Sequence, residues 1–201
     1  MLVEGIKSRP VYHGLAIQPH ARWHLFVLEG EGALALLDQG SMLDDATLSR
    51  SEILYVARGS QGKGHDDALR GLGADMFFTA PTIGTLLFRL RGSLSTAHMG
   101  TRLYIAGTEG FIGQAMMVAL DLGMDYASIM TEHRGSLARR VQCVHCKGTT
   151  DDVMHSPFAC SHCGLPLLVR DHYSRRLGAF QGVNIDAEEP GSAPDPEELF
   201  L

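Results

Sequence analysis

The feature that most constrains the fold of this chain is a pair of C-x-x-C motifs in its C-terminal third. The motifs are Cys143-Val-His-Cys146 and Cys160-Ser-His-Cys163, and they contain all four cysteines of the sequence. A two-residue spacer lets one tight turn direct two sulfur atoms at a common centre, and two such turns complete a tetrahedral S4 site. We therefore predict that Cys143, Cys146, Cys160 and Cys163 bind one metal ion.

The spacing leaves the identity of the metal open. Four thiolates suit Zn2+ or a single iron ion, whereas the usual spacings of 2Fe–2S clusters are longer and asymmetric. We favour zinc in a structural role, because a module of about 40 residues cannot bury enough apolar surface to fold alone. His145 and His162 precede the second cysteine of each motif, and we expect them on the rim of a site that four thiolates already fill.

Two disulfides are the alternative arrangement for the four cysteines. The first residues of the chain lack the layout of a secretory signal, which favours reduced thiols and a cytoplasmic location. The formal net charge of −6 argues against a nucleic-acid partner, because a phosphate backbone attracts basic surfaces. Apolar runs stay well short of a membrane span, so we expect no membrane partner.

Short apolar segments alternate with helical segments in the first two thirds of the chain. The expected strands are 23–28, 53–57, 75–79, 102–106 and 126–130, and the expected helices are 33–37, 82–94 and 111–122. Such alternation is typical of a parallel sheet covered on both faces. We predict a small, doubly wound α/β domain over residues 1–135, with any ligand crevice at the carboxyl ends of its strands.

Two glycine-containing segments follow expected strands, where doubly wound domains hold phosphate groups. Gly107-Thr-Glu-Gly-Phe111 separates a strand from a helix, but glycine also serves plain turns there. Gly59-Ser-Gln-Gly-Lys-Gly64 lacks the Walker spacing and is better interpreted as a loop. Neither a Ser–His–Asp set nor paired carboxylates stand out. We expect no catalytic residue in this chain and assign no cofactor-binding residue.

The remaining segments are assigned by their composition. Residues 1–20 are expected to form an arm or edge strand, and residues 141–183 a zinc-ribbon or rubredoxin-like module with a strand at 165–169. Residues 184–201, rich in proline and acidic side chains, are expected to form an acidic, flexible tail. We expect Arg170 to Gln181 and the metal module to form much of the contact with a partner, which would cover Leu165, Leu167 and Phe180.

Part of the α/β domain resembles a known reductase domain. Arg102-Leu-Tyr-Ile-Ala-Gly-Thr-Glu-Gly-Phe-Ile112, continued through Gly123 to Ser128-Ile-Met-Thr-Glu132, is similar to the last β-α-β unit of ferredoxin-reductase-type nicotinamide domains. In that family a cysteine-glycine pair usually follows the strand, whereas Ala106-Gly107 stands here, and a flavin-binding barrel does not precede the domain. The resemblance implies a degenerate reductase-like domain without hydride transfer of its own.

The whole arrangement resembles a second family. The α/β domain, the two cysteine motifs and Arg170-Asp-His-Tyr-Ser-Arg-Arg-Leu-Gly-Ala-Phe-Gln-Gly182 are similar to the DmmA-like subunits of bacterial dimethylamine monooxygenase. This resemblance implies a multi-subunit, haem-dependent enzyme that uses NADPH and O2 to convert dimethylamine to methylamine and formaldehyde. It also implies partner subunits that carry haem, FMN and a 2Fe–2S cluster.

Within such an assembly the chain is expected to be a non-catalytic or electron-relay subunit with a structural metal site. Two other classes of function are retained as alternatives. One is a rubredoxin-like iron electron carrier or a stand-alone reductase component. The other is a zinc-ribbon adaptor for protein or nucleic acid.

Overall fold

The structure, a computed structural model, describes residues 8–58 and 64–201. These residues form two compact units: residues 12–135 make one, and residues 8–11 together with 136–201 make the other. Gly59 to Lys63, most of the glycine-rich loop considered above, lies outside the described residues, as does the start of the expected N-terminal arm.

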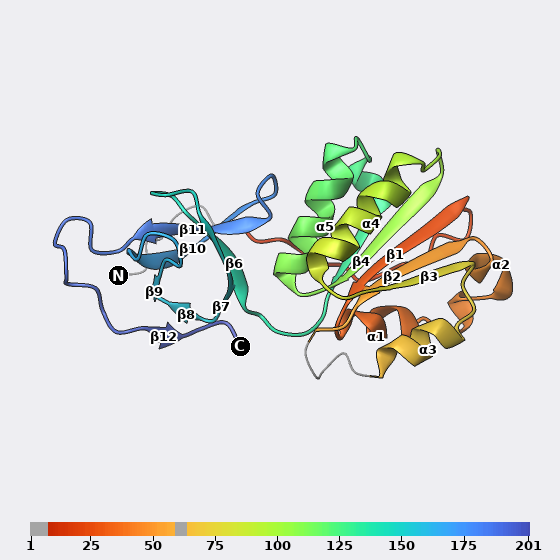
Figure 1. The fold of residues 1–201 in the computed structure, drawn as a ribbon, viewed down its shortest axis with the longest axis horizontal. Helices are drawn as coiled ribbons and strands as arrows, with labels where there is room; N and C mark the ends of the chain where they lie inside the picture. Colours follow the sequence, from red (N-terminus) through yellow and green to blue (C-terminus); the bar gives the residue numbers. More distant parts are fainter. Residues whose placement is uncertain (1–7, 59–63) are drawn as a thin grey trace. The chain divides into compact units, whose positions relative to one another are not determined.

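The first unit is built on a five-stranded parallel sheet with the strand order β3-β2-β1-β4-β5 (Figure 1). Its strands are β1 (Trp23–Glu29), β2 (Ser51–Val56), β3 (Met76–Ala80), β4 (Thr101–Gly107) and β5 (Ile129–His133). The predicted parallel α/β sheet is therefore confirmed. The order reverses between β1 and β4, which is the point where doubly wound folds open a ligand crevice.

Helices cover both faces of this sheet, α1 and α3 on one and α4 and α5 on the other (Figure 1). The helices are α1 (Gly32–Leu37), α2 (Asp45–Leu48), α3 (His65–Gly71), α4 (Ile83–Ser95) and α5 (Glu109–Asp121), with 3-10 turns η1 (Gly40–Met42) and η2 (Tyr126–Ser128). Alternate strand residues face opposite layers. Val27 packs under α4 and α5, and Phe26 and Leu28 pack under α1 and α3.

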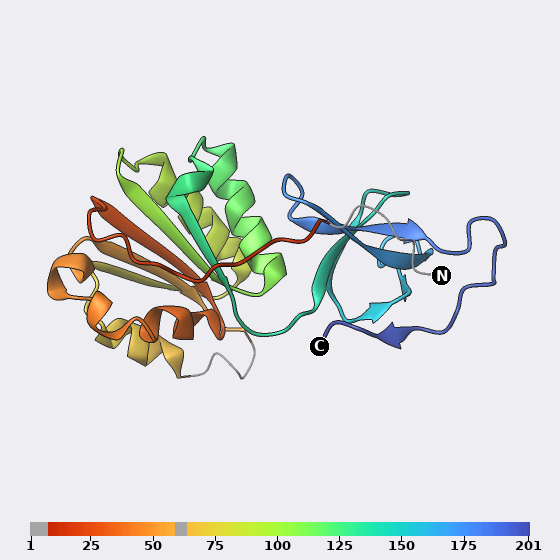
Figure 2. The ribbon, with the colours of Figure 1, turned by 180° about the vertical axis from the view of Figure 1, so that it is seen from behind.

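One expectation about this unit is corrected by the structure, and an open alternative is decided. The last strand occupies 129–133 and not 126–130, because the Asp125 carboxylate accepts a hydrogen bond from the amide of Ala127 at 3.1 Å and closes the turn η2. The described part of the N-terminal arm forms no edge strand along residues 12–17. It runs beside β5 (Figure 2), where the amide of Leu15 donates to Glu132 Oε2 at 2.9 Å.

The second unit contains a mixed five-stranded sheet with the order β7-β6-β11-β10-β9. Its strands are β6 (Arg139–Cys143), β7 (Thr149–Val153), β9 (Phe158–Ala159), β10 (Pro166–Ser174) and β11 (Ala179–Asn184); β8 (His155–Ser156) pairs separately with β12 (Glu197–Glu198). The strand expected at 165–169 is the beginning of the longer β10. β6 and β11 run parallel, so residues 39 positions apart in the sequence lie side by side, as Val141 and Phe180 do.

A small core holds this second sheet together. Val141, Val153, Val169 and Phe180 are buried, and Phe200 packs against them. The guanidinium of Arg139 lies 4.0 Å from the ring centroids of both Phe180 and Phe200 and 2.9 Å from Asp171 Oδ1. Residues from the segment expected to be a flexible tail therefore contribute a strand and a core side chain to this unit.

The expectation that a partner covers Leu167 and Phe180 is wrong. Both side chains are already buried within the unit, Leu167 beneath the cysteines and Phe180 beside Arg139. Along the described ranges, 8–58 and 64–201, no helix is both long enough and apolar enough to cross a bilayer.

Candidate metal centre

The structure brings the four cysteines together. All four Sγ atoms lie within 4.8 Å of one another, with Cys143 Sγ 3.9 Å from Cys163 Sγ and Cys146 Sγ 3.7 Å from Cys160 Sγ. A tetrahedron with metal–sulfur bonds of about 2.3 Å has edges of about 3.8 Å, whereas a disulfide would place two sulfurs about 2.05 Å apart. The cysteines are free thiols, and their spacing fits one metal ion with four sulfur ligands.

Two turns with the same hydrogen-bond pattern position the sulfurs. In the first, the amide of Lys147 donates to Cys143 O at 3.0 Å, and the amide of Cys143 donates to Gly148 O at 2.9 Å. In the second, Gly164 donates to Cys160 O and Cys160 donates to Leu165 O, both at 2.9 Å. Each C-x-x-C motif is thus closed at equivalent positions, which is why both present their two sulfurs in the same way.

Gly148 and Gly164 have different roles in the two turns, although the amide of Gly148 also donates toward Cys146 Sγ at 3.4 Å. The left-handed position of each turn is the residue after its second cysteine, Lys147 with φ 65° and Gly164 with φ 75°. Gly148 is required for another reason: a Cβ there would lie 2.4 Å from the ring of His162. His162 packs across Gly148 and makes a 2.9 Å hydrogen bond from Nε2 to Thr149 O. His162 therefore joins the second turn to β7, the strand that follows the first turn.

The site has a buried side and an exposed side. Cys143 and Cys160 are buried beside Leu167, whereas Cys146 and Cys163 are exposed. The rings of His145 and His162 are also exposed, in line with the expected position on the rim. Metal held here would be anchored in the core of the unit and would present two sulfur ligands to solvent.

The four thiols are not equivalent as acids. Burial raises the pKa of Cys160, but the amides of Cys163 and His162 donate toward its sulfur and lower that pKa to about 6. The amide of Leu165 acts to lower the pKa of Cys163, yet burial and the neighbouring sulfurs outweigh it and raise that pKa to about 12. The four thiols influence one another's protonation, and a cation that binds the sulfurs displaces the remaining thiol protons.

A second polar arrangement lies at the carboxyl edge of the parallel sheet, between β1 and β4. Glu29 is 1% exposed, and its Oε2 accepts hydrogen bonds from the amide of Thr108 at 2.9 Å and from Thr108 Oγ1 at 2.7 Å. Its Oε1 accepts from Arg58 Nη1 at 3.0 Å. Thr108 is the N-cap of α5, so this carboxylate occupies the position where a nucleotide phosphate would meet the helix.

The glycines near Glu29 leave room for its carboxylate and for close approach of the backbone. A Cβ at Gly107 would lie 2.9 Å from Glu29 Oε2, and a Cβ at Gly32 would lie 2.1 Å from Ala106 O. The glycines thus allow the chain to approach itself, and the crevice at the switch point is filled by Glu29. Gly107 was considered from the sequence as part of a phosphate-binding or plain turn, whereas the Glu29 side chain was given no role. Its signal is an acidic residue that ends an apolar strand just before a glycine.

The chain thus consists of a doubly wound α/β domain followed by a four-cysteine module. Its sequence matches the two domains described as dimethylamine monooxygenase subunit DmmA-like, the N-terminal domain over residues 4–129 and the C-terminal domain over residues 140–183. The chain therefore belongs to the DmmA-like family, which confirms the resemblance drawn from the sequence.

Individual proteins agree with this assignment. The chain is 32% identical over 152 residues to the heme-dependent oxidative N-demethylase delta subunit of Ectopseudomonas mendocina (strain ymp), covering 73% of this chain and 86% of that relative.

Among solved structures, the flavohem-like FAD/NAD-binding domain of nitric oxide dioxygenase from Vibrio cholerae O1 biovar El Tor aligns with a TM-score of 0.45 at 17% identity, covering 63% of this chain and 56% of that one. Full-length CYP116B46 from Tepidiphilus thermophilus aligns with a TM-score of 0.45 at 18% identity, and the chain spans 67% of its own length and 19% of that protein.

Proposed function

We propose that this chain is a non-catalytic subunit of a haem-dependent, multi-subunit dimethylamine monooxygenase, and that its four cysteines hold a structural Zn2+. The observation that carries the proposal is the sulfur cluster with edges of 3.7 and 3.9 Å in a member of the DmmA-like family. The family relative is itself the delta subunit of a heme-dependent oxidative N-demethylase.

Two features support a non-catalytic role. Four thiolates leave a tetrahedral ion without an open position, so substrate chemistry at this metal is disfavoured. At the other candidate site, the carboxylate of Glu29 already takes the hydrogen bonds that a phosphate would take. Hydride transfer, flavin chemistry and oxygen activation are therefore assigned to partner subunits that carry haem, FMN and a 2Fe–2S cluster and that use NADPH.

Zinc would stabilise the second unit by fixing both turns at once. The core of that unit contains only a handful of buried apolar side chains among its described residues, so ligation would supply much of its folding free energy. Reduced cysteines are compatible with the cytoplasm, and the acidic chain is not suited to a nucleic-acid or membrane partner.

The exposed sulfurs of Cys146 and Cys163 favour a second candidate function, single-electron relay by iron in the same four-sulfur site. Two solvent-facing ligands would give a partner's cofactor a short route to the metal. This role requires iron, so the two candidates differ in a property that is measured directly.

Elemental analysis of the purified chain, together with its optical spectrum, tests the proposal. We expect one zinc per chain and no visible absorption. Stoichiometric iron with a thiolate charge-transfer band would overturn the structural-zinc assignment in favour of the relay.

A second measurement addresses assembly: Cys146→Ser should reduce co-purification with the haem and reductase subunits. Full turnover of dimethylamine by the isolated chain would contradict the non-catalytic role.

A further inference from the structure

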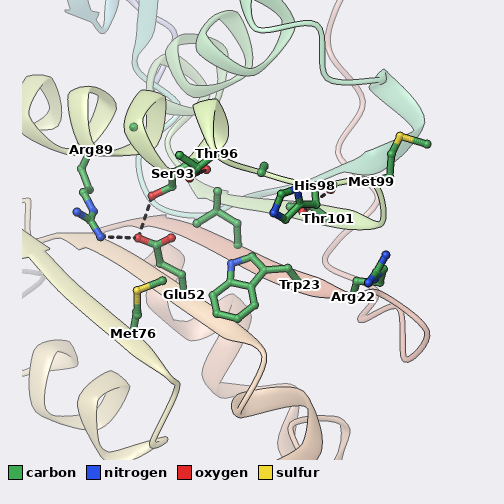
Figure 3. Close-up of a pocket in the computed structure, with 13 residues that line it drawn as sticks. Arg22, Trp23, Glu52, Met76, Arg89, Ser93, Thr96, His98, Met99 and Thr101 are labelled. Carbon is green, nitrogen blue, oxygen red and sulfur yellow. Dashed lines mark hydrogen bonds and ion pairs between the residues drawn. The ribbon is translucent and has the colours of Figure 1, made fainter.

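A large pocket opens at the amino edge of the parallel sheet, opposite the edge that holds Glu29. It has a volume of about 900 Å³ and lies between the first residues of β1 to β4, the C-terminal half of α4 and the loop that follows α4 (Figure 3). The pocket and the four cysteines belong to different units and share no residue. Ligand binding in this pocket therefore does not depend on the metal in the four-cysteine site, and only the partner-subunit alternative below rests on the proposed function.

The pocket contains a buried carboxylate, that of Glu52. Glu52 is the second residue of β2, a strand whose six residues are all buried, and its side chain is 3% exposed. Its Oε1 accepts hydrogen bonds from Ser93 Oγ at 2.9 Å and from Arg89 Nη2 at 3.2 Å. A buried carboxylate is costly unless both of its oxygens are satisfied.

The second oxygen of this carboxylate faces the pocket. Among the described residues, none donates a hydrogen bond to Glu52 Oε2, and this atom is not sealed from solvent. Figure 3 shows that it points away from Arg89, toward the side on which Trp23 lies. The pocket therefore offers a strong, unused acceptor and calls for a ligand that donates a hydrogen bond.

The wall beside this acceptor is aromatic and apolar. Trp23, the single tryptophan of the sequence, lines the pocket together with Leu25 and Met76. An indole face attracts cations more strongly than any other side-chain ring, and thioethers pack readily against alkyl groups. An acceptor oxygen beside an indole ring suits a positively charged nitrogen that carries alkyl groups.

The two arginines that line the pocket do not favour an anion instead. Arg89 contacts Glu52 from the α4 side, and its charge is neutralised by that carboxylate. Arg22 is exposed, and a Cβ at Gly100 would lie 2.9 Å from its Cγ, so its stem lies against the backbone while its charge is solvated. An anion placed near Trp23 would face Glu52 Oε2 and be repelled.

We propose that the pocket lined by Trp23 and Glu52 binds an alkylammonium group, with its N–H donating to Glu52 Oε2 and its alkyl groups against the indole. The group has two sources, a free small amine or the lysine side chain of a partner subunit. Both present the same chemistry to the pocket.

Fluorescence of the single tryptophan gives a direct test on the intact, metal-loaded chain. Dimethylammonium represents a free amine and butylammonium represents a lysine side chain; 1-butanol, 2-propanol and butyrate are the neutral and anionic comparisons, all at matched ionic strength. We expect a saturable change with at least one ammonium ion and none with the other compounds. Tighter binding of dimethylammonium indicates the free amine, and tighter binding of butylammonium indicates the lysine.

Variants test whether ammonium binding depends on the carboxylate of Glu52 or only on the shape of the pocket. Glu52→Gln should weaken ammonium binding at least tenfold, whereas Glu31→Gln, at the other edge of the same sheet, should leave it unchanged. If the ligand is a partner lysine, Glu52→Gln should also reduce co-purification with partner subunits.

Three results would overturn the assignment: no saturable ammonium response, equal or tighter binding of butanol or butyrate, or unchanged ammonium binding in a folded Glu52→Gln protein. If Glu52→Gln does not fold, the comparison of ammonium, alcohol and carboxylate on the unmodified chain still decides the question. None of these outcomes depends on the metal in the four-cysteine site, so failure here and failure of the proposed function are distinguishable.

Discussion

At the scale of single residues, the metal centre depends on backbone positions as much as on sulfur. The two turns share their hydrogen bonds, yet the left-handed residue is lysine in one and glycine in the other. A non-glycine residue in that region costs about 1 kcal/mol, so the first turn is the more strained of the two. Gly148, by contrast, is fixed by the ring that packs on it.

Gly148→Ala should therefore weaken the centre. The new Cβ would collide with the ring of His162 and push the second turn away, and we expect a loss of about 1–3 kcal/mol in the stability of the second unit. Thermal unfolding and competition for zinc with a chromophoric chelator would measure it. Gly71→Ala, where a Cβ meets no atom within 4 Å, is the matched control. Equal zinc affinity in both variants would contradict this role of Gly148.

A second residue-scale prediction concerns His24, which is fully buried at the start of β1. Burial and the nearby charge of Arg50 lower its pKa below the ordinary value of 6.5. The unfolded chain then takes up a proton at a higher pH than the folded chain does. The contribution of neutral His24 to stability is complete above about 6.5 and is lost as the pH falls from there through the folded-state pKa.

Urea unfolding followed by Trp23 fluorescence should show this loss between pH 7.5 and 5.5. In His24→Leu the pH dependence in this window should be weaker, whatever the absolute stability, because no imidazole remains to titrate. A slope identical to that of the unmodified protein would show that another group is responsible.

At the scale of elements, the segment nearest the C-terminus is part of the second unit. β12 pairs with β8, and the guanidinium of Arg139 lies 4.0 Å from the ring centroids of both Phe200 and Phe180. A buried arginine needs both its ion pair and its covering rings. The prediction of a flexible tail rested on the acidic, proline-rich composition of this segment. Composition is an average, and it gives no weight to the position of the one aromatic residue, Phe200.

Phe200→Ala should lower the stability of the second unit by about 1–3 kcal/mol, because it removes apolar cover from Arg139 and from the core. Leu201→Ala is the control, since that side chain is 67% exposed and Leu201 contributes its backbone oxygen to Leu137. Chelator-induced unfolding, followed by far-ultraviolet circular dichroism, compares the two. Equal midpoints would mean that the Phe200 contact adds nothing.

The elements that could be predicted are those whose signal is local. Apolar runs such as 53–57 and 102–106 predicted a parallel sheet because buried strands are continuously apolar, and the cysteine spacing predicted four converging sulfurs. Contacts distant in sequence carried no such signal. The burial of Phe180 depends on Arg139 and Phe200, and the role of Glu52 depends on Ser93 and Arg89, so both became visible only in the folded chain.

At the scale of the whole molecule, the two units have separate cores and separate sources of stability. The clusters beneath α4 and α5 and beneath α1 and α3 lie entirely within residues 12–135, whereas the small clusters around Phe180 and the cysteines lie within residues 136–201. Only the second unit has a small core, which the proposed metal would make up for.

Removal of the metal should therefore unfold one unit and spare the other. With a strong chelator, we expect protease cleavage within residues 136–201, while Trp23 fluorescence and the urea midpoint of residues 12–135 stay unchanged. Re-addition of zinc should restore protection. Loss of both units together would show that they fold as one cooperative body.

The parallel pairing of β6 with β11 also has a consequence for the order of events during synthesis. The strands of the first unit end at His133, so the ribosome completes that unit early, and it can fold while translation continues. The first two cysteines emerge next, and their strand β6 can pair with β7 soon afterwards, but its second neighbour β11 is missing until residues 180–182 are made. Arg139 remains uncovered by the Phe200 ring until the end of the chain is added. The sheet that packs against the four cysteines is thus completed only near the end of synthesis, after all four thiols have already been made.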